Sequence, residues 1–190
     1  MSDRKYHHGN LRHSLLEAGL AELERVGPEA LSLRELARQV GVSPNAPYRH
    51  FETKEDLLQS MIEWGFDLMA ERFAQVRAID PSDIHAMGDA YLVMAKEHPQ
   101  LMRLMFAPCA AMPESDEFLK EGPMNAWQML VDTARRRLGK PEVDDDVIRT
   151  TTALWALVHG LQELNRMGIF DHPAISGTPV GQFHELLRQV

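Results

Sequence analysis

Apolar residues recur along most of this chain at spacings of three and four, the period of an amphipathic helix, and strict alternation typical of strands is scarce. In the segment 10–27, for example, Leu11, Leu15 and Ala18 share one helical face, and Gly27 is placed to end the helix. No internal repeat or low-complexity tract interrupts this pattern. It predicts an all-α protein of about nine helices.

Prolines, glycines and capping residues divide the pattern into segments. Ser32 with Glu35, and Thr53 with Asp56, have the spacing of capping boxes, and Pro99 breaks a long apolar stretch. The helices are predicted over 10–27, 32–41, a short piece near 45–51, 53–76, 81–98, 100–106, a part of 115–138, 144–168 and a final amphipathic piece near 180–190.

The stretch VSPNAPYRHF, residues 42–51, decides most of the functional interpretation. Two helices joined through Gly41 match a helix-turn-helix over residues 32–51, provided that both prolines lie in the first turn of the second helix. Ser43 could cap that helix, but a later start with Asn45 as the cap leaves Pro47 without a lost hydrogen bond, so we expect a helix of about two turns. Its phase turns Pro47 and Phe51 inward and leaves five residues facing solvent or a duplex: Asn45, Ala46, Tyr48, Arg49 and His50. The alternative is a polar surface turn.

Charge and composition narrow the class of protein. The chain has 190 residues and a net charge of −8, yet residues 1–51 carry seven Lys and Arg against six Asp and Glu, so the acidity belongs to the rest. That N-terminal part is permissive for phosphate. Cys109 is the single cysteine, which excludes an intrachain disulfide and favours a reduced, cytoplasmic setting. The sequence has no signal peptide and no apolar run of the roughly 18 residues that cross a bilayer, so no membrane partner is expected.

The segment LSLRELARQVGVSPNAPYRHFETKEDLL resembles the DNA-binding part of the tetracycline-repressor (TetR) family of bacterial transcription regulators. The resemblance covers residues 9–69, which are expected to form a three-helix DNA-binding domain, with residues 70–190 forming a helical domain for effector binding and dimerisation. YHHGNLR before the first helix and LWALVHG near the end resemble a subgroup with a C-terminal Trp…His-Gly motif. Pro47 departs from the aliphatic residue common in the family.

The resemblance implies a repressor that binds a palindromic double-stranded operator as a homodimer. Ser43, Asn45, Ala46 and Pro47 match positions that approach bases, and Tyr48, His50 and Lys54 match phosphate contacts. The expected DNA-binding residues are Lys5, His7, His8, Arg34, Ser43, Asn45, Ala46, Pro47, Tyr48, Arg49, His50 and Lys54. No metal or other cofactor is predicted, because His7 and His8 are adjacent and lack a third ligand nearby.

For the C-terminal part, helical phase predicts a mostly apolar effector cavity and a dimer seam. The cavity would be lined by Tyr91, Met94, His98, Met102, Met105, Phe106, Trp127, Trp155 and His159, although close-packed core is an equal interpretation. The seam would contain Leu157, Leu161, Leu164, Phe183, Leu187 and Val190. No nucleophile elbow, phosphate-binding glycine loop or metal-ligand spacing indicates an enzyme. The other alternative is a DNA-binding protein that no small molecule controls.

Overall fold

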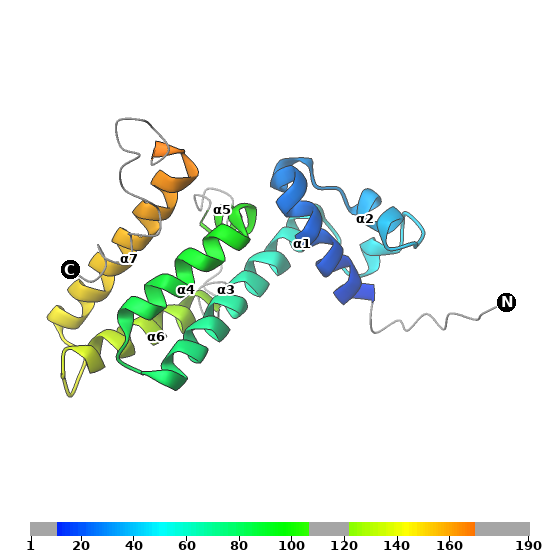
Figure 1. Cartoon of the computed structure of the whole chain (residues 1–190). Coiled ribbons are helices and arrows are strands. Elements are labelled where there is room, and N and C mark those ends of the chain that lie inside the picture. The colour runs from blue at the N-terminus through cyan, green and yellow to red at the C-terminus, as the bar shows by residue number, and fades with distance from the viewer. Residues whose placement is uncertain (1–10, 107–121, 170–190) are drawn as a thin grey trace. The chain divides into compact units, whose positions relative to one another are not determined.

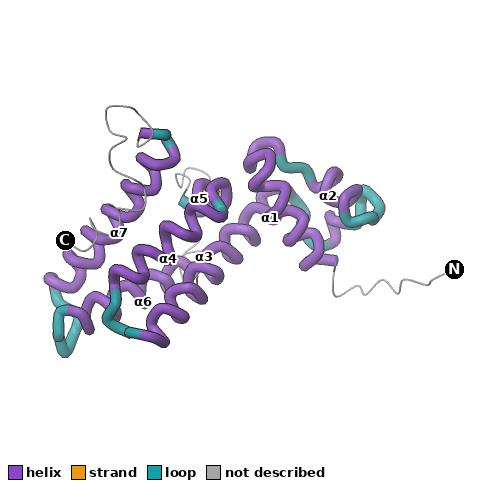
Figure 2. The backbone as a smooth tube through the Cα atoms, viewed as in Figure 1, coloured by secondary structure: helices purple, strands orange, loops and turns teal. Residues whose placement is uncertain are grey.

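The computed structural model describes residues 11–106 and 122–169, and within these ranges every regular element is helical (Figure 2). The chain divides into two compact units. Of the described residues, the first unit comprises 11–65 and 100–106, and the second comprises 66–99 and 122–169.

The first unit contains α1 (Leu11–Ala30), α2 (Leu33–Gln39), the 3₁₀ turn η1 (Pro47–Arg49), the beginning of α3 (Lys54–Ile79) and α5 (Pro99–Met105) (Figure 1). η1 packs against both α1 and α2. Burial of apolar side chains is the main driving force for this packing. The core residues, none more than 1% exposed, include Leu15, Leu23, Leu36, Phe51, Leu57 and Met61.

Two glycines set the ends of the first helices. Gly27 has φ 76° and ψ 169° and kinks α1 just before Pro28, so the straight helix ends where the sequence predicted. Gly41 has φ 75° and turns the chain after α2. Positive φ is strained for residues that carry a Cβ, and glycine is therefore the suitable residue at both positions.

The second unit contains the rest of α3, α4 (Ile84–Glu97), α6 (Gly122–Arg137) and α7 (Asp145–Arg166). α4, α6 and α7 pack against one another. Asp83 caps α4 by accepting a hydrogen bond from the backbone N–H of Ala86 at 2.9 Å, and Asp144 caps α7 through Val147 N at 3.0 Å. Its core residues, none more than 1% exposed, include Phe73, Met87, Met94, Thr133, Ala134, Val147 and Thr151.

Two sequence expectations about helices need correction. The described ranges hold seven α-helices and one 3₁₀ turn, where about nine helices were predicted; the last predicted segment, 180–190, lies outside the described residues. The Thr53/Asp56 capping box forms, with backbone-to-side-chain distances of 2.9 and 3.1 Å. The Ser32/Glu35 box does not, because the Glu35 carboxylate accepts two hydrogen bonds from Arg38, at 3.0 and 2.5 Å, which are charge-assisted.

The two units differ from the predicted domains, 9–69 and 70–190, at residues 66–69, which fall in the second unit, and at residues 100–106. The backbone N–H groups of Gln100 and Leu101 each donate to the carboxylate of Glu24 in α1, both at 3.0 Å. Arg103 forms an ion pair with Glu29. These contacts place residues 100–106 in the first unit, although they follow α4 of the second unit in the chain.

Candidate nucleic-acid interface

The turn formed by residues 43–50 follows α2 and contains η1. Ala46 N donates to Ser43 O at 2.9 Å, and His50 N and Phe51 N both donate to Pro47 O, at 2.9 and 3.0 Å. The predicted recognition helix of about two turns is therefore a single 3₁₀ turn of three residues. Pro47 has no N–H and cannot donate to the carbonyl of Ser43, and after Arg49 the chain turns to bury Phe51 and to begin the cap at Thr53.

The structure exposes most of the predicted interface residues that it describes. Arg34, Ser43, Asn45, Tyr48 and Arg49 are exposed, and Ala46, His50 and Lys54 are half-buried. Pro47 is buried, so its side chain packs in the core and is not presented to a base edge. Lys5, His7 and His8 lie outside the described residues.

Ion pairs decide which arginines of the first unit remain available for phosphate. Glu22 accepts from Arg25 at 3.0 and 2.6 Å and from Gln39 of α2 at 3.3 Å, so its carboxylate joins α1 to α2. The hydrogen bonds from Arg25 lower the pKa of Glu22, and those from Arg38 lower the pKa of Glu35. Within residues 11–106 and 122–169, Arg34 and Arg49 have no carboxylate partner. Their guanidinium groups can bind a duplex without first breaking an ion pair described here.

Lys54 starts α3 and has a local partner of its own. Its Nζ donates to the backbone carbonyl of Glu29 at 2.7 Å. An ammonium group has three donors, so this bond holds the side chain in place and leaves two donors for a phosphate.

Two residues of α1 that the sequence interpretation missed organise this unit. Arg12 NH2 donates to Ser60 Oγ at 2.9 Å, and the Arg12 guanidinium carbon lies 5.1 Å from the centroid of the Phe51 ring. Glu24 caps α5, as described above. The partners of Arg12 are 39 and 48 residues away along the chain, and those of Glu24 are 76 and 77 residues away, so no local motif signals either contact.

The predicted effector residues fall into both units. Met102, Met105 and Phe106 belong to the first unit, and the other six belong to the second. In the second unit, the Tyr91 hydroxyl and His159 Nδ1 share a hydrogen bond of 2.6 Å, while the Trp127 and Trp155 rings meet edge to face with centroids 5.7 Å apart. Met94 is fully buried and His98 is half-buried. Burial raises the pKa of Tyr91 above its ordinary value of 10.0.

A pocket of about 390 Å³ lies between α4 and α7. Its size is within the range of small-molecule sites, roughly 300–1,000 Å³. None of the nine predicted effector residues lines it, whereas the predicted seam residue Leu161 does. The lining residues are Asp89, Leu92, Val93, Ala95, Lys96, Pro99, Leu161, Gln162, Asn165 and Arg166.

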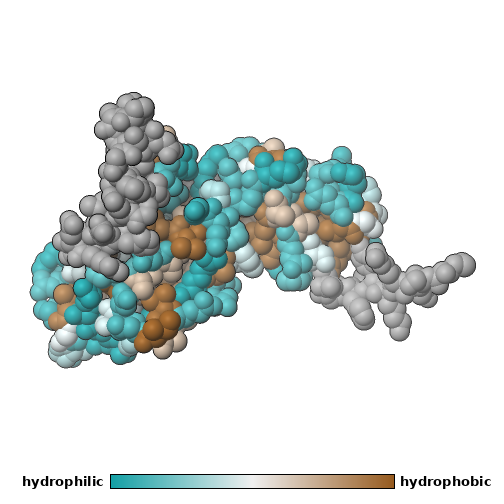
Figure 3. Space-filling model, in the orientation of Figure 1, coloured by the Kyte–Doolittle hydropathy of each residue, from teal (hydrophilic) through white to brown (hydrophobic). Residues whose placement is uncertain are grey.

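The predicted seam residues of α7 differ in exposure. Leu164 is 42% exposed, Leu157 is half-buried and Leu161 is 7% exposed within one chain. Phe183, Leu187 and Val190 lie outside the described residues. Brown areas in Figure 3 show that hydrophobic residues reach the visible surface of this unit.

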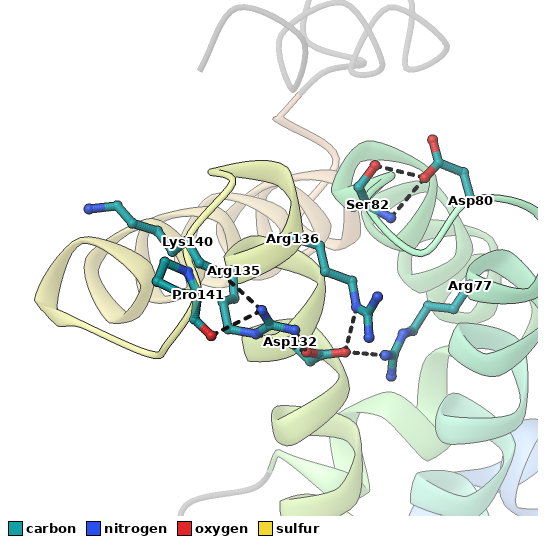
Figure 4. Close-up of polar contacts among 8 residues, drawn as sticks. All are labelled: Arg77, Asp80, Ser82, Asp132, Arg135, Arg136, Lys140 and Pro141. Carbon is teal, nitrogen blue, oxygen red and sulfur yellow. Dashed lines mark hydrogen bonds and ion pairs between the residues drawn. The ribbon is translucent and has the colours of Figure 1, made fainter.

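A polar cluster joins α3 to α6 in the second unit. The Asp132 carboxylate accepts hydrogen bonds from Arg135 at 3.1 and 2.6 Å and from Arg136 at 2.9 Å, and it forms an ion pair with Arg77. Figure 4 shows Asp132 between these side chains, with Lys140 pointing away. Burial raises the pKa of Asp132, but the hydrogen bonds and the arginine charges outweigh burial and lower it.

In residues 11–106 and 122–169, no helix has the length and apolar character to span a bilayer. In these two ranges, His, Cys, Asp and Glu side chains also form no group of three or more suited to a metal ion.

Comparison with known proteins identifies the family. Residues 15–61 match the family described as bacterial regulatory proteins, tetR family, and residues 84–188 match the tetracyclin repressor-like C-terminal domain. The chain belongs to the TetR family of regulators. It is therefore a DNA-binding transcription regulator, and the surface around residues 43–50 is its candidate DNA interface.

Relatives of this TetR-family chain include nucleoid occlusion factors. The factor SlmA of Idiomarina loihiensis is 30% identical over 99 residues, which cover 50% of each protein, so the chain spans about half the length of that relative. SlmA of Marinobacter nauticus is 29% identical over 147 residues, covering 75% of this chain and 73% of its own.

Two solved structures have a similar fold. A protein of unknown function from Rhodococcus sp. RHA1 is 28% identical, with a TM-score of 0.77 over 98% of this chain and 94% of its own. A possible TetR family transcriptional regulator from Streptomyces coelicolor A3(2) is 21% identical, with a TM-score of 0.64 over 94% and 95% of the two chains. The second likeness concerns the fold alone.

Proposed function

We propose that this regulator is a repressor that binds a palindromic operator as a homodimer and leaves it when a small, largely apolar effector binds the second unit. The observation that carries the DNA-binding part is the outward orientation of Ser43, Asn45, Tyr48 and Arg49 on one short turn above a buried Pro47 and Phe51. Amide and guanidinium groups suit base edges, and hydroxyl and guanidinium groups suit phosphates.

The short turn is also the argument for a dimer. A single 3₁₀ turn of three residues buries too little surface for a specific site, which usually involves roughly 1,000–2,500 Å² of protein. A two-fold dimer doubles the contact and requires half-sites about 34 Å apart. The exposed Leu164 and half-buried Leu157 support a seam along α7. Leu161 faces the interior of its own chain and would contribute less to this dimer seam.

The effector part rests on the second unit. Trp155, His159 and Gly160 are the residues that resemble the Trp…His-Gly subgroup, and we assign the chain to that subgroup as part of this proposal. Tyr91 of α4 and His159 of α7 supply polar groups within a mainly apolar core, and the same two helices enclose a pocket, although neither residue lines it.

The experiment begins with selection of duplexes from a random pool by the full-length protein. We expect an inverted repeat, bound by a species that sediments as a dimer. Leu157→Glu combined with Phe183→Glu should yield monomers that lose the full operator. A selected site without two-fold symmetry, or a dimer that survives both substitutions, would contradict the homodimer and its seam.

Effector control is tested separately with a compound library. We expect some largely apolar compounds to raise the melting temperature by binding the folded protein. The same compounds should weaken operator binding by about 1–3 kcal/mol, and operator should weaken their binding by the same factor. Trp155→Ala and His159→Ala should bind operator normally but lose this response. If every stabilising compound leaves operator affinity unchanged, the protein is instead a DNA-binding regulator that no small molecule controls.

A further inference from the structure

The 43–50 turn cannot hold its own position. η1 has three residues, and a 3₁₀ turn of that length has little intrinsic stability. Its orientation must therefore come from contacts with neighbouring helices. Phe51, which follows the turn and is 1% exposed, is the largest side chain that anchors it to the core of the first unit.

The Arg12 side chain lies over the ring of Phe51. Its guanidinium carbon lies 5.1 Å from the Phe51 ring centroid, a cation–π contact, and its NH2 donates to Ser60 Oγ at 2.9 Å. One side chain at the start of α1 thus contacts both Phe51, which follows the turn, and Ser60 of α3. Ser60 is 9% exposed, so its hydroxyl lies on the inner side of α3.

From this geometry we infer that Arg12 is a positioning residue for DNA recognition. Through Phe51 and Ser60 it fixes the orientation of η1. It thereby also fixes the directions in which the side chains of Asn45, Tyr48 and Arg49 point into solvent. Arg12 belongs to none of the positions matched to DNA contacts above. The role depends on shape as well as charge, because a planar guanidinium can stack on a ring while its N–H groups donate in fixed directions, whereas an ammonium group is a compact point charge without that geometry.

The competing role is a direct phosphate contact, since Arg12 is exposed. The two roles differ in what they require. A phosphate contact needs positive charge, so lysine would replace arginine, and removing the charge would lower the salt slope by about 0.9. Positioning needs the flat guanidinium and the Ser60 hydroxyl, so lysine would fail and Ser60→Ala would have an effect without any change of charge.

The test uses the full-length protein and the operator selected from random duplexes. Arg12→Lys, Ser60→Ala and the control Arg103→Lys, an exposed arginine of the same unit, are compared with wild type. Three quantities are measured: affinity for the operator, affinity for an unrelated duplex, and the salt slope. Circular dichroism and melting temperature confirm that each variant folds.

We expect Arg12→Lys to lower the ratio of specific to non-specific affinity about tenfold, since it loses a charge-assisted hydrogen bond and a cation–π contact. Ser60→Ala should lower the ratio about threefold, because only the hydrogen bond is lost. Both should leave non-specific affinity and the salt slope unchanged, and Arg103→Lys should match wild type. The inference is overturned if Arg12→Lys and Ser60→Ala both behave as wild type, or if they weaken specific and non-specific binding equally.

Discussion

In the first unit, polar side chains of the 43–50 turn are exposed to solvent above a small apolar core. In the second unit, polar side chains such as Tyr91 and Asp132 instead bind other side chains of the same unit. Asn45, Tyr48 and Arg49 are exposed. Tyr91 and His159 share a hydrogen bond, and Asp132 accepts from two arginines and pairs with a third. Exposed polar groups are available to a partner molecule. Paired groups first contribute to the stability of the fold, and a ligand must compete with those existing contacts.

The largest expected effect lies in the core below the turn. Phe51→Ala removes a ring that is 1% exposed and should lower the free energy of unfolding by about 3–5 kcal/mol, because a cavity remains. DNA binding should be lost with it. Urea denaturation measures the change, and Ile79→Ala is the control: Ile79 is 90% exposed, and we expect a change within about 0.5 kcal/mol. A variant that keeps wild-type stability would show that Phe51 does not anchor the turn.

Tyr91→Phe tests whether the polar pair of the second unit is part of the packed fold. We expect the free energy of unfolding in urea at neutral pH to fall by about 1–2 kcal/mol, since one partly buried hydrogen bond disappears. Because burial raises the Tyr91 pKa above 10.0, the contribution is complete below pH 10 and declines as the pH rises further, when the unfolded tyrosine ionises and the folded one does not.

The difference between wild type and Tyr91→Phe should therefore stay constant up to about pH 9 and shrink as the pH rises through the ordinary tyrosine pKa of about 10 toward the raised pKa of the folded protein. Denaturation midpoints across that range provide the measurement. Equal stability of the two proteins at neutral pH would instead favour an open cavity around Tyr91 over packed core.

Asp132→Asn tests the cluster between α3 and α6. Loss of the shared carboxylate leaves the guanidinium groups of Arg77, Arg135 and Arg136 close together. We expect a cost of about 1 kcal/mol, reduced by the partial exposure of the site. Since the pKa of Asp132 is lowered in the folded state, the contribution is present above its ordinary pKa of 3.8 and is lost as the pH falls below it.

Denaturation midpoints at several pH values measure this contribution, and Asp67→Asn, an exposed carboxylate of α3, is the control. A gap between wild type and Asp132→Asn that persists unchanged at low pH would show that the effect does not come from the ionised carboxylate.

The smallest effect concerns charge at the interface. Lys54→Ala should weaken binding to every duplex modestly and reduce the salt slope by about 0.9, as expected for one phosphate contact. Lys96→Ala, in the second unit, should change neither. Fluorescence titrations at several salt concentrations measure both quantities. An unchanged slope for Lys54→Ala would mean that its bond to Glu29 holds the ammonium away from DNA.

Local signals in the sequence were enough to predict most helix ends. Gly27, the Thr53/Asp56 pair and Pro99 lie at or beside the observed boundaries, because caps and breakers act within one helical turn. They failed where a second partner competes, as Arg38 does for Glu35. They also failed where two constraints meet, as in η1, whose length is limited from both ends by Pro47 and the Thr53 cap.

The candidate sites were predictable to different degrees for the same reason. Helical phase predicts which face a side chain occupies, and this was sufficient for the exposed residues of the 43–50 turn. It does not predict whether neighbouring side chains fill the space in front of that face, which depends on helices that are distant in sequence. Tyr91 and His159 share a hydrogen bond, but their role in an effector cavity stays a prediction, and the pocket between α4 and α7 was not predicted.

The cap on α5 has a consequence for the order of folding. A seven-residue helix is too short to persist alone in water. The backbone amides of Gln100 and Leu101 in α5 donate to Glu24, which lies 76 and 77 residues before them in the chain. Closing so long a loop is entropically costly and slow, so α5 should form only after α1 and the chain between them are in place. Protection of the Gln100 and Leu101 amides in a pulsed hydrogen-exchange experiment would then appear late. The time at which these two amides become protected would therefore report when the first unit has finished folding.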